Sequence, residues 1–383
     1  MHENLENDKI EKMTAPPSVL MVGAFPPPVH GMAAVNAAVH EQLVRVGGEP
    51  TVINIAAKTL ERSLLVRLGR VWKVAYGLSR LLFSNSLRNS TLYMSVSGGF
   101  GQVYEIFFLA LARFRRMRVY LHHHSFAYLD KSKWVTHILT FVAGSNCVHI
   151  VLSTGMAQRL QSQYSSACRV LAISNAVFFS NQQALSVVPR NSLKIIGFIS
   201  NISVEKGIFE FLDLVAAYEA EGLTLQAKIA GPCQDKEIEN ILMQRISTLK
   251  TVEYIGPQYG DDKELFFNEI DVLIFPTCYA NEAEPLTIYE AMQRAIPVIA
   301  YGRGSIPEMV NVKCGLVIKP AAPFSPAALE KIKQWLSCPN EYTEASISAV
   351  KSFAIALEIN SQRWDELRRD ILGNGDSIDT KIS

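Results

Sequence analysis

Two glutamates eight positions apart are the clearest candidates for chemistry in this 383-residue sequence. Glu282 lies in a polar loop after an apolar run, and Glu290 lies a little inside a helix expected to begin at about Pro285. A second apolar run, 297–301, follows, so the segment 271–308 is predicted to form a strand, a loop, a helix and a strand. Ligands bind beyond the carboxyl ends of the strands in such sheets, and we expect both carboxylates to face that crevice.

A run of three histidines is the second candidate. His122, His123 and His124 follow a short apolar run, 119–121, and are therefore expected at the carboxyl edge of a sheet. Side chains alternate in an extended chain, so only His122 and His124 share a side, which is a poor metal site without a third ligand. A structural role and a place in the crevice are both consistent with this position. The six cysteines show no CxxC spacing, which disfavours a zinc site and indicates reduced thiols in a cytosolic setting.

Glycine turns in each half of the chain offer contacts for a phosphate. Gly31 lies between a predicted first strand, 18–23, and a helix of about 32–46, where backbone amides can approach a phosphate at the helix N-terminus. The GxGxxG fingerprint is absent, so a loop that needs glycine for its turn fits equally well. In the second half, Lys206 and Gly207 lie in a loop after another predicted strand.

The length of the chain favours two domains, because 383 residues exceed one ordinary core. Two series of alternating strands and helices predict an α/β protein of two doubly wound, Rossmann-like domains that face each other across a cleft. The expected parts are listed here in order: a disordered leader (1–17), an N-terminal domain (18–190), a C-terminal domain (191–355), and a C-terminal helix with a tail returning toward the first domain (356–383).

Charge and hydropathy restrict the partners. The net charge of +1 gives no case for a nucleic-acid partner from overall charge. The polar, acidic N-terminus is unlike a signal peptide, and no window reaches the ~18 uncharged apolar residues that a spanning helix needs. The segment 64–83 places cations such as Arg67, Arg70 and Lys73 among bulky apolar residues with no acid. It fits a helix on an anionic membrane surface, and equally a packed helix with a solvated basic face. We expect a cytoplasmic protein, peripheral on the inner face of the cytoplasmic membrane in the first case.

Taken together, these motifs resemble the retaining glycosyltransferase family 4, whose members have the two-domain GT-B fold. The resemblance covers roughly 18–318 and depends on several ordered motifs at suitable separations. The matching positions are Gly31 on the first loop, His122 where the family has a histidine at the donor sugar, Asn175 after the last strand of the first domain, Lys206 as the phosphate-binding lysine, and Glu282 with Glu290 as the E-x7-E pattern.

The resemblance implies that the chain moves a sugar from a nucleotide-diphosphate sugar to an acceptor, retaining the anomeric configuration, with no metal or other cofactor. The donor would lie mainly against the second domain, and the acceptor would enter from the first. Glu290 would bind the ribose hydroxyls, and Glu282 would lie near the transferred sugar, opposite His122. Lys206, assisted by the Gly31 amide, would neutralise the departing diphosphate.

Further donor contacts are implied at the start of the helix after Glu282. Backbone amides around Glu284, Leu286 and Thr287 would hold sugar and phosphate oxygens. Two positions depart from the family, because Glu284 replaces a common aromatic residue and Pro285 a common glycine. Proline has no amide to donate, so we expect the donor pocket to differ here.

A third departure lies on the loop before Lys206. Asn201 is counted among the donor-binding positions, but the family often has arginine there. The diphosphate would then be held by Lys206 alone unless Arg303 or another residue substitutes, and the loss of a bidentate guanidinium usually weakens phosphate binding.

The expected function is transfer to a glycan or lipid-linked acceptor in cell-envelope polysaccharide or lipopolysaccharide biosynthesis. Two alternatives remain open. One is a non-catalytic nucleotide-sugar-binding protein, which the three departures favour. The other is a different enzyme on the GT-B fold, such as a sugar-nucleotide epimerase or a phosphorylase.

Overall fold

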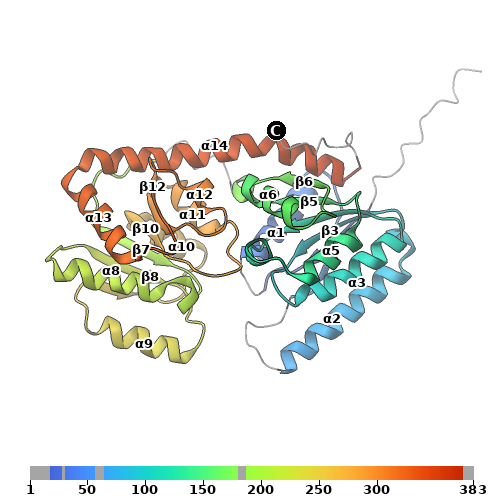
Figure 1. Ribbon diagram of the computed structural model, residues 1–383, viewed down its shortest axis with the longest axis horizontal. Coiled ribbons are helices and arrows are strands. Elements are labelled where there is room, and N and C mark those ends of the chain that lie inside the picture. Colours follow the sequence, from blue (N-terminus) through green and yellow to red (C-terminus); the bar gives the residue numbers. More distant parts are fainter. Residues whose placement is uncertain (1–17, 28–30, 57–63, 180–186, 374–383) are drawn as a thin grey trace, which may run out of the picture.

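The protein consists of two α/β domains joined side by side and bridged by one long helix (Figure 1). The computed structural model describes residues 18–27, 31–56, 64–179 and 187–373. The predicted leader, 1–17, lies outside the described residues. Each domain is built around a parallel six-stranded sheet with helices on both faces, which confirms the predicted pair of doubly wound domains.

The first sheet has the strand order β2-β1-β3-β4-β5-β6. Its strands are β1 (Val19–Gly23), β2 (Thr51–Asn54), β3 (Thr91–Val96), β4 (Arg118–His123), β5 (Val148–Val151) and β6 (Arg169–Ala172). Its helices are α1 (Gly31–Arg45), α2 (Leu64–Phe83), α3 (Gly101–Phe114), α4 (Ala127–Asp130), α5 (Trp134–Ala143) and α6 (Thr154–Gln163), with 3-10 turns η1 (Asn85–Leu87) and η2 (Asn175–Phe178). Strands β1 and β3 are buried at every residue because helices cover both faces, as the continuous apolar runs require.

The second sheet has the strand order β12-β11-β10-β7-β8-β9. Its strands are β7 (Ile195–Ile199), β8 (Gln226–Ala230), β9 (Val252–Tyr254), β10 (Val272–Phe275), β11 (Val298–Tyr301) and β12 (Gly315–Ile318). Its helices are η3 (Val204–Lys206), α8 (Ile208–Ala220), α9 (Lys236–Ile246), α10 (Gly260–Glu269), α11 (Leu286–Met292), α12 (Ile306–Met309) and α13 (Phe324–Ser337). The strand, loop, helix and strand predicted within 271–308 are β10, α11 and β11 with their loop, and β10 pairs in parallel with β11.

Two apolar clusters hold the helices of the first domain against opposite faces of its sheet. On one face, Leu121 of β4 belongs to a cluster with Leu81 of α2 and Phe108 of α3, which α5 also joins. On the other face, Tyr120 belongs to a cluster with Val39 of α1. Helices α2, α3 and α5 therefore cover one face, and α1 covers the other with the end of the last helix (Figure 1).

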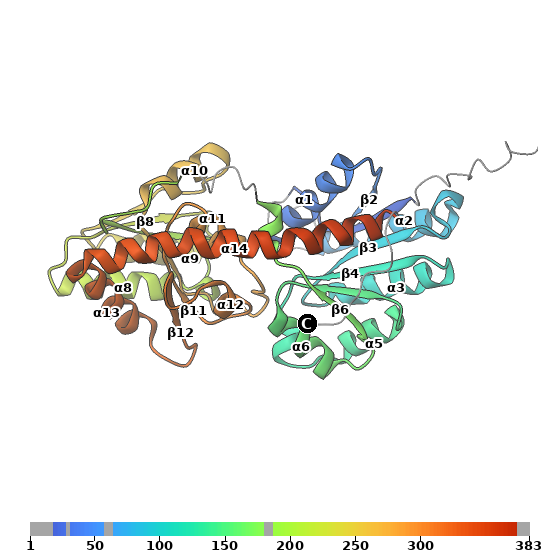
Figure 2. The same ribbon diagram turned by 90° about the horizontal axis from the view of Figure 1, so that it is seen from above.

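The last helix, α14 (Pro339–Ile371), is 33 residues long and contacts both domains (Figure 2). The sequence predicts that a C-terminal helix follows the second domain from residue 356, and this boundary falls inside one continuous helix. Its middle turns pack on the second domain through Phe353, which is completely buried. Its last turns pack on the first domain through Trp364, and the Tyr120 hydroxyl donates a hydrogen bond of 2.7 Å to Asp370. None of the described helices is long and apolar enough to cross a membrane.

Replacing Trp364 by Ala should lower the free energy of unfolding by about 3–5 kcal/mol, because the indole is 2% exposed and packs edge-on against Phe178. Chemical denaturation of the variant measures the loss. Glu366→Ala, at an exposed position in the same turn, is the matched control and should change the free energy little. Equal losses in the two variants would contradict a role for Trp364 in docking α14.

Candidate functional site

The loop 276–285, between β10 and α11, carries Glu282 and is packed tightly against the loop that carries Lys206. Gly207 has a φ of 87°, and a Cβ at this position would lie 2.2 Å from the Pro276 carbonyl oxygen. The Cys278 amide donates a hydrogen bond of 2.8 Å to the Glu205 carbonyl oxygen. Only glycine permits this conformation and this close approach. The backbone of the second domain therefore fixes the distance between the two loops.

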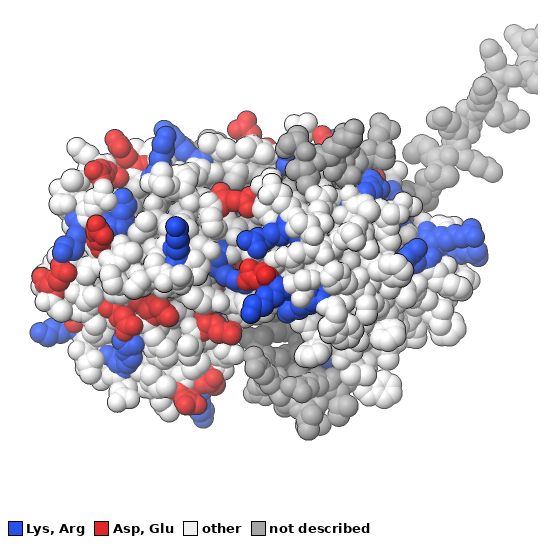
Figure 3. Space-filling view, in the orientation of Figure 1, with Lys and Arg blue, Asp and Glu red and all other residues white. Residues whose placement is uncertain are grey.

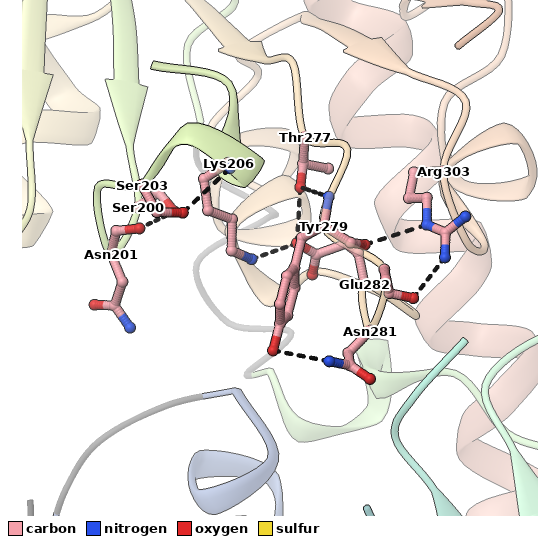
Figure 4. A network of polar contacts seen from close by, with 10 residues as sticks. Ser200, Asn201, Ser203, Lys206, Thr277, Tyr279, Asn281, Glu282 and Arg303 are labelled. Atoms are coloured by element: carbon pink, nitrogen blue, oxygen red, sulfur yellow. Dashed lines mark hydrogen bonds and ion pairs between the residues drawn. The ribbon is translucent and has the colours of Figure 1, made fainter. Parts of the chain in front are cut away.

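Lys206 and Glu282 form an ion pair at this junction (Figure 4). The Lys206 Nζ lies 2.5 Å from Glu282 Oε2, and the Thr277 hydroxyl donates to the same oxygen at 3.3 Å. The ammonium also lies 4.7 Å from the centre of the Tyr279 ring. The two charged side chains are only 20% and 11% exposed, so each charge is compensated mainly by protein rather than water.

The glycine turn after β11 supports the same loop from the other side. The Ser305 amide donates to the Ala283 carbonyl oxygen at 2.7 Å, and a Cβ on Gly304 would lie 2.5 Å from the Glu282 carbonyl oxygen. The Arg303 guanidinium donates to the Tyr279 carbonyl oxygen and pairs with Asp130 of the first domain. Figure 4 shows Arg303 on the far side of the loop from Asn201, so it does not replace an arginine there.

Asn201 and Gly31, which the sequence predicts to bind phosphate, are both exposed. Asn201 lies between β7 and η3, and its side chain makes no polar contact with the described residues (Figure 4). Gly31 is the first residue of α1, and a Cβ there would have no neighbour within 4 Å among the described residues.

Glu290 lies in the second turn of α11 and forms an ion pair with a second lysine. Lys263, on α10, places its ammonium 2.5 Å from Glu290 Oε1. The other oxygen, Oε2, is buried and accepts no hydrogen bond from the described residues. The structure thus separates the two glutamates of the motif, and each pairs with a different lysine. Sequence reasoning missed Lys263, whose only signal was its place beside two acids at a helix start.

His122 lies inside β4, where its side chain is 1% exposed. Its Nδ1 lies 2.5 Å from the Tyr93 hydroxyl, and its Nε2 is buried with no hydrogen-bond partner among the described residues. Burial lowers the pKa of His122 well below its usual value, so the imidazole is neutral. The rings of His122 and His124 are 4.0 Å apart, as expected for residues that share a side of the strand. Among the described residues, no three His, Cys, Asp or Glu side chains gather as a metal site.

The segment after the histidines contacts the loop that carries Glu282. The Ser125 hydroxyl donates to Asn281 Oδ1 at 2.9 Å, and the Phe126 amide donates to the Asn281 carbonyl oxygen at 3.4 Å. Gly98, which follows β3, also faces this amide, because a Cβ there would lie 1.9 Å from Asn281 Oδ1. The candidate site is therefore formed where the carboxyl edges of the two sheets meet.

The side chain of Glu284 is directed into the contact between the two domains, and the expectation that the donor pocket differs at Glu284 and Pro285 stays a prediction. Its carboxyl is buried and accepts hydrogen bonds from the Asn175 amide at 2.6 Å, the Ser174 hydroxyl at 2.9 Å and the Tyr289 hydroxyl at 3.1 Å. Asn175 Nδ2 also donates to the Glu284 carbonyl oxygen at 3.1 Å. Because Ser174 and Asn175 end the first domain, this cluster ties the two domains together.

The start of α11 lies directly after this cluster. Pro285 is buried at the N-cap, and Leu286 and Thr287 are half-buried in the first turn. The amides of a first turn have no acceptor four residues earlier within the helix, so they are suited to an outside acceptor. The predicted role of these amides in binding a donor stays a prediction.

Comparison with known proteins bears on the family and on the fold. Residues 183–352 match the family model described as glycosyl transferases group 1. The match covers the second domain and less than half of the chain. No curated protein matches the chain by sequence.

Several solved structures share the fold of the whole chain. Anabaena HepE in complex with UDP-glucose superimposes with a TM-score of 0.67 at 16% identity, covering 92% of this chain and 99% of that one. Sucrose-phosphate synthase from Thermosynechococcus elongatus has a TM-score of 0.70 at 13% identity, covering 93% and 99%. A glycosyltransferase from Rickettsia africae has a TM-score of 0.64 at 15% identity, covering 94% and 100%. The protein therefore has the GT-B fold that the sequence predicts.

The stability of the fold should depend on the protonation of Glu284. Burial raises the pKa of Glu284 to about 8, so the folded protein holds this proton more tightly than the unfolded chain. Stability from this group is present at low pH and is lost as the pH rises toward about 8. In Glu284→Gln, whose amide does not titrate, the melting temperature should fall less between about pH 5 and 8. Parallel pH profiles for the two proteins would contradict this.

Proposed function

We propose that the protein is a retaining glycosyltransferase that moves a sugar from a nucleotide-sugar donor to a glycan or lipid-linked acceptor. The observation that carries the proposal is the Lys206–Glu282 ion pair, formed at the meeting edges of the two sheets and inside the matched family region. The complex of HepE with UDP-glucose supports a nucleotide sugar as the class of donor.

Lys206 and Glu282 would change partners when the donor binds. A diphosphate offers the Lys206 ammonium more negative charge than one carboxylate does, and sugar hydroxyls can donate hydrogen bonds to the carboxylate that the lysine leaves. Charge on the diphosphate grows as the bond to the anomeric carbon breaks, so a fixed ammonium favours the transition state. The Glu282 carboxylate would also favour the positive charge that develops at the sugar.

Glu290 and the amides at the start of α11 would complete the donor site. The buried Oε2 of Glu290 accepts no hydrogen bond from the described residues and is suited to a ribose hydroxyl. The amides of Leu286 and Thr287 would hold sugar or phosphate oxygens, with the Gly31 amide contributing from the first domain. Asn201 would add a neutral contact on the loop before Lys206.

The bond changes follow from retention. The bond between the anomeric carbon and the diphosphate oxygen breaks, and the acceptor oxygen bonds to the same face of that carbon. The acceptor proton passes to the departing diphosphate, so no protein nucleophile is required. The neutral His122, whose buried Nε2 has no hydrogen-bond partner among the described residues, would contact the sugar or the attacking hydroxyl as a hydrogen-bonding partner. We propose that this reaction proceeds without a metal ion.

The proposal places the reaction in cell-envelope polysaccharide or lipopolysaccharide synthesis, at the inner face of the cytoplasmic membrane. The acid-free, cationic segment 64–83, which forms α2, supports a membrane surface as a partner.

A second candidate function, nucleotide-sugar binding without catalysis, is favoured by Asn201. Asn201 has no charge, and Arg303 forms its ion pair with Asp130. Lys206 is therefore the only cation that the described contacts place at the carboxylate of Glu282. A binding protein would take up the donor without turning it over, which the kinetic experiment below distinguishes.

Replacing Lys206 by Ala should lower kcat by at least about a hundredfold, because the departing diphosphate loses its cation. Release of nucleoside diphosphate from a panel of nucleotide sugars, with and without acceptor, measures the rate. Glu290→Gln should mainly weaken donor binding, by about tenfold, because an amide accepts fewer hydrogen bonds from a ribose. Lys319→Ala, an exposed lysine of the same domain, is the control.

A donor that raises the melting temperature of all four proteins without any turnover would favour the binding protein. An unchanged kcat in Lys206→Ala would contradict the role of this lysine. A product released from donor alone, without acceptor or hydrolysis, would instead indicate an epimerase.

A further inference from the structure

The exposed tryptophans and phenylalanines of the described chain all lie on one side of the first domain. They are carried by α2, by α3 with the residue before it, and by α5, and are as follows: Trp72, Phe83, Phe100, Phe107, Phe114, Trp134 and Phe141. The exposed large apolar residues of the second domain are scattered, and none of them is a tryptophan or a phenylalanine. Single exposed apolar residues are ordinary, but a concentration of this kind marks an interaction surface.

Each of the three helices presents these residues as a stripe. In α2, Trp72 and Tyr76 are four positions apart and 77% and 68% exposed. In α3, the series Phe100, Val103, Phe107 and Phe114 follows helical spacing, and α5 continues it with the exposed residues 134, 138 and 141. Helices α2, α3 and α5 also contribute buried side chains to the core beneath them, so they are apolar on both sides. A surface helix ordinarily has a polar outer side.

The charged residues in the part of the sequence that contains these three helices are nearly all positive. Between residues 64 and 204 the chain has 15 lysines and arginines, and its only acids are Glu105 and Asp130. Glu105 is 1% exposed, and Asp130 pairs with Arg303 of the second domain. The lower right of Figure 3, where α2 and α3 lie, shows uncharged surface with blue side chains at its edge and no red ones. Such a surface complements a negatively charged partner.

We propose that the outer face of α2, α3 and α5, here called the aromatic face, docks on an anionic lipid bilayer. Tryptophan and phenylalanine are the side chains that interfacial helices bury at the boundary of headgroups and acyl chains, and lysine and arginine bind anionic headgroups. A nucleic acid would be expected to need cations over the whole contact rather than aromatic residues at its centre.

The aromatic face differs from the basic stripe that the sequence indicated for 64–83. Arg70 lies 5.5 Å over the Tyr104 ring, and the Lys73 ammonium donates to the Ala56 carbonyl oxygen at 2.8 Å. These two cations are therefore held against the protein, and the side chain of Arg67 lies outside the described residues. The exposed cations beside the aromatic face include Arg80 on α2 and Lys131 before α5.

One edge of the aromatic face reaches the candidate site. Phe100, 90% exposed, stands two residues after Gly98, which faces Asn281 in the loop of Glu282. Lys133, next to Trp134, donates to the Gly98 carbonyl oxygen at 3.2 Å. A docked bilayer would therefore lie beside the mouth of the site, which suits a lipid-linked acceptor. This last point, unlike the docking itself, rests on the proposed function.

Co-sedimentation with vesicles tests the docking. We expect the full-length protein to pellet with phosphatidylglycerol-containing vesicles at low salt, and much less with pure phosphatidylcholine. Arg80→Gln with Lys131→Gln should weaken binding by about thirtyfold, since each cation near an anionic surface contributes about fivefold. Lys313→Gln with Lys319→Gln, exposed lysines of the second domain, is the matched control and should bind as the unchanged protein does.

Tryptophan fluorescence tests the insertion. Of the four tryptophans, Trp72 and Trp134 are exposed, whereas Trp335 and Trp364 are each 2% exposed. Anionic vesicles should shift the emission to shorter wavelength, and Trp72→Phe with Trp134→Phe should remove the shift while binding persists. Trp72→Ser, Phe107→Ser and Trp134→Ser combined should abolish pelleting, and the control Tyr259→Ser, Leu265→Ser and Val312→Ser should not.

Three outcomes would overturn the docking proposal. They are equal pelleting with both kinds of vesicle, no pelleting with either, and lipid-free self-association that the three serine substitutions remove. The last would assign the aromatic face to a second copy of the chain. Failure of the proposed function is separate, because Lys206→Ala should still pellet, and the serine variant should still release nucleoside diphosphate with a water-soluble acceptor.

Discussion

The buried carboxyl of Glu284 is the contact on which the arrangement of the two domains most depends. It receives hydrogen bonds from the end of the first domain while it belongs to the loop that carries Glu282 in the second. Asn281 and Arg303 add bonds to the first domain on either side of it. Because one loop is bonded to both domains, any change in their relative position must move the carboxylate of Glu282.

The two glutamates of the motif are stabilised without a donor. A carboxylate that is largely removed from water is costly unless it is paired, and Lys206 and Lys263 each supply a cation at 2.5 Å. These pairs keep the loop and α11 in place before a substrate arrives. A substrate that separates Lys206 from Glu282 must give each side chain an equally good partner. A nucleotide sugar can do so, because its diphosphate replaces the carboxylate beside Lys206 and its sugar hydroxyls replace the ammonium beside Glu282.

The fold was readable from the sequence because continuous apolar runs separated by helical patterns specify buried parallel strands. The partners within the site were less readable. Lys206 and Glu282 are 76 residues apart and meet because β7 lies next to β10 in the sheet, and Glu284 is satisfied by residues of the other domain. His122 is buried because its ring turns toward Tyr93 on the neighbouring strand. Side-chain spacing along one chain contains no information on such contacts.

The overall charge concealed the most informative feature of the composition. Residues 18–190 contain 17 lysines and arginines against five acids, whereas residues 191–383 contain 18 against 27. The net charge of +1 is the sum of these two opposite domain charges and the net charge of −2 on residues 1–17. Near an anionic surface, such a charge distribution turns the first domain toward the surface and the second away from it. A donor held by the second domain would then approach from the aqueous side and an acceptor from the lipid side, so the candidate site where the two sheets meet would receive its two substrates from different sides.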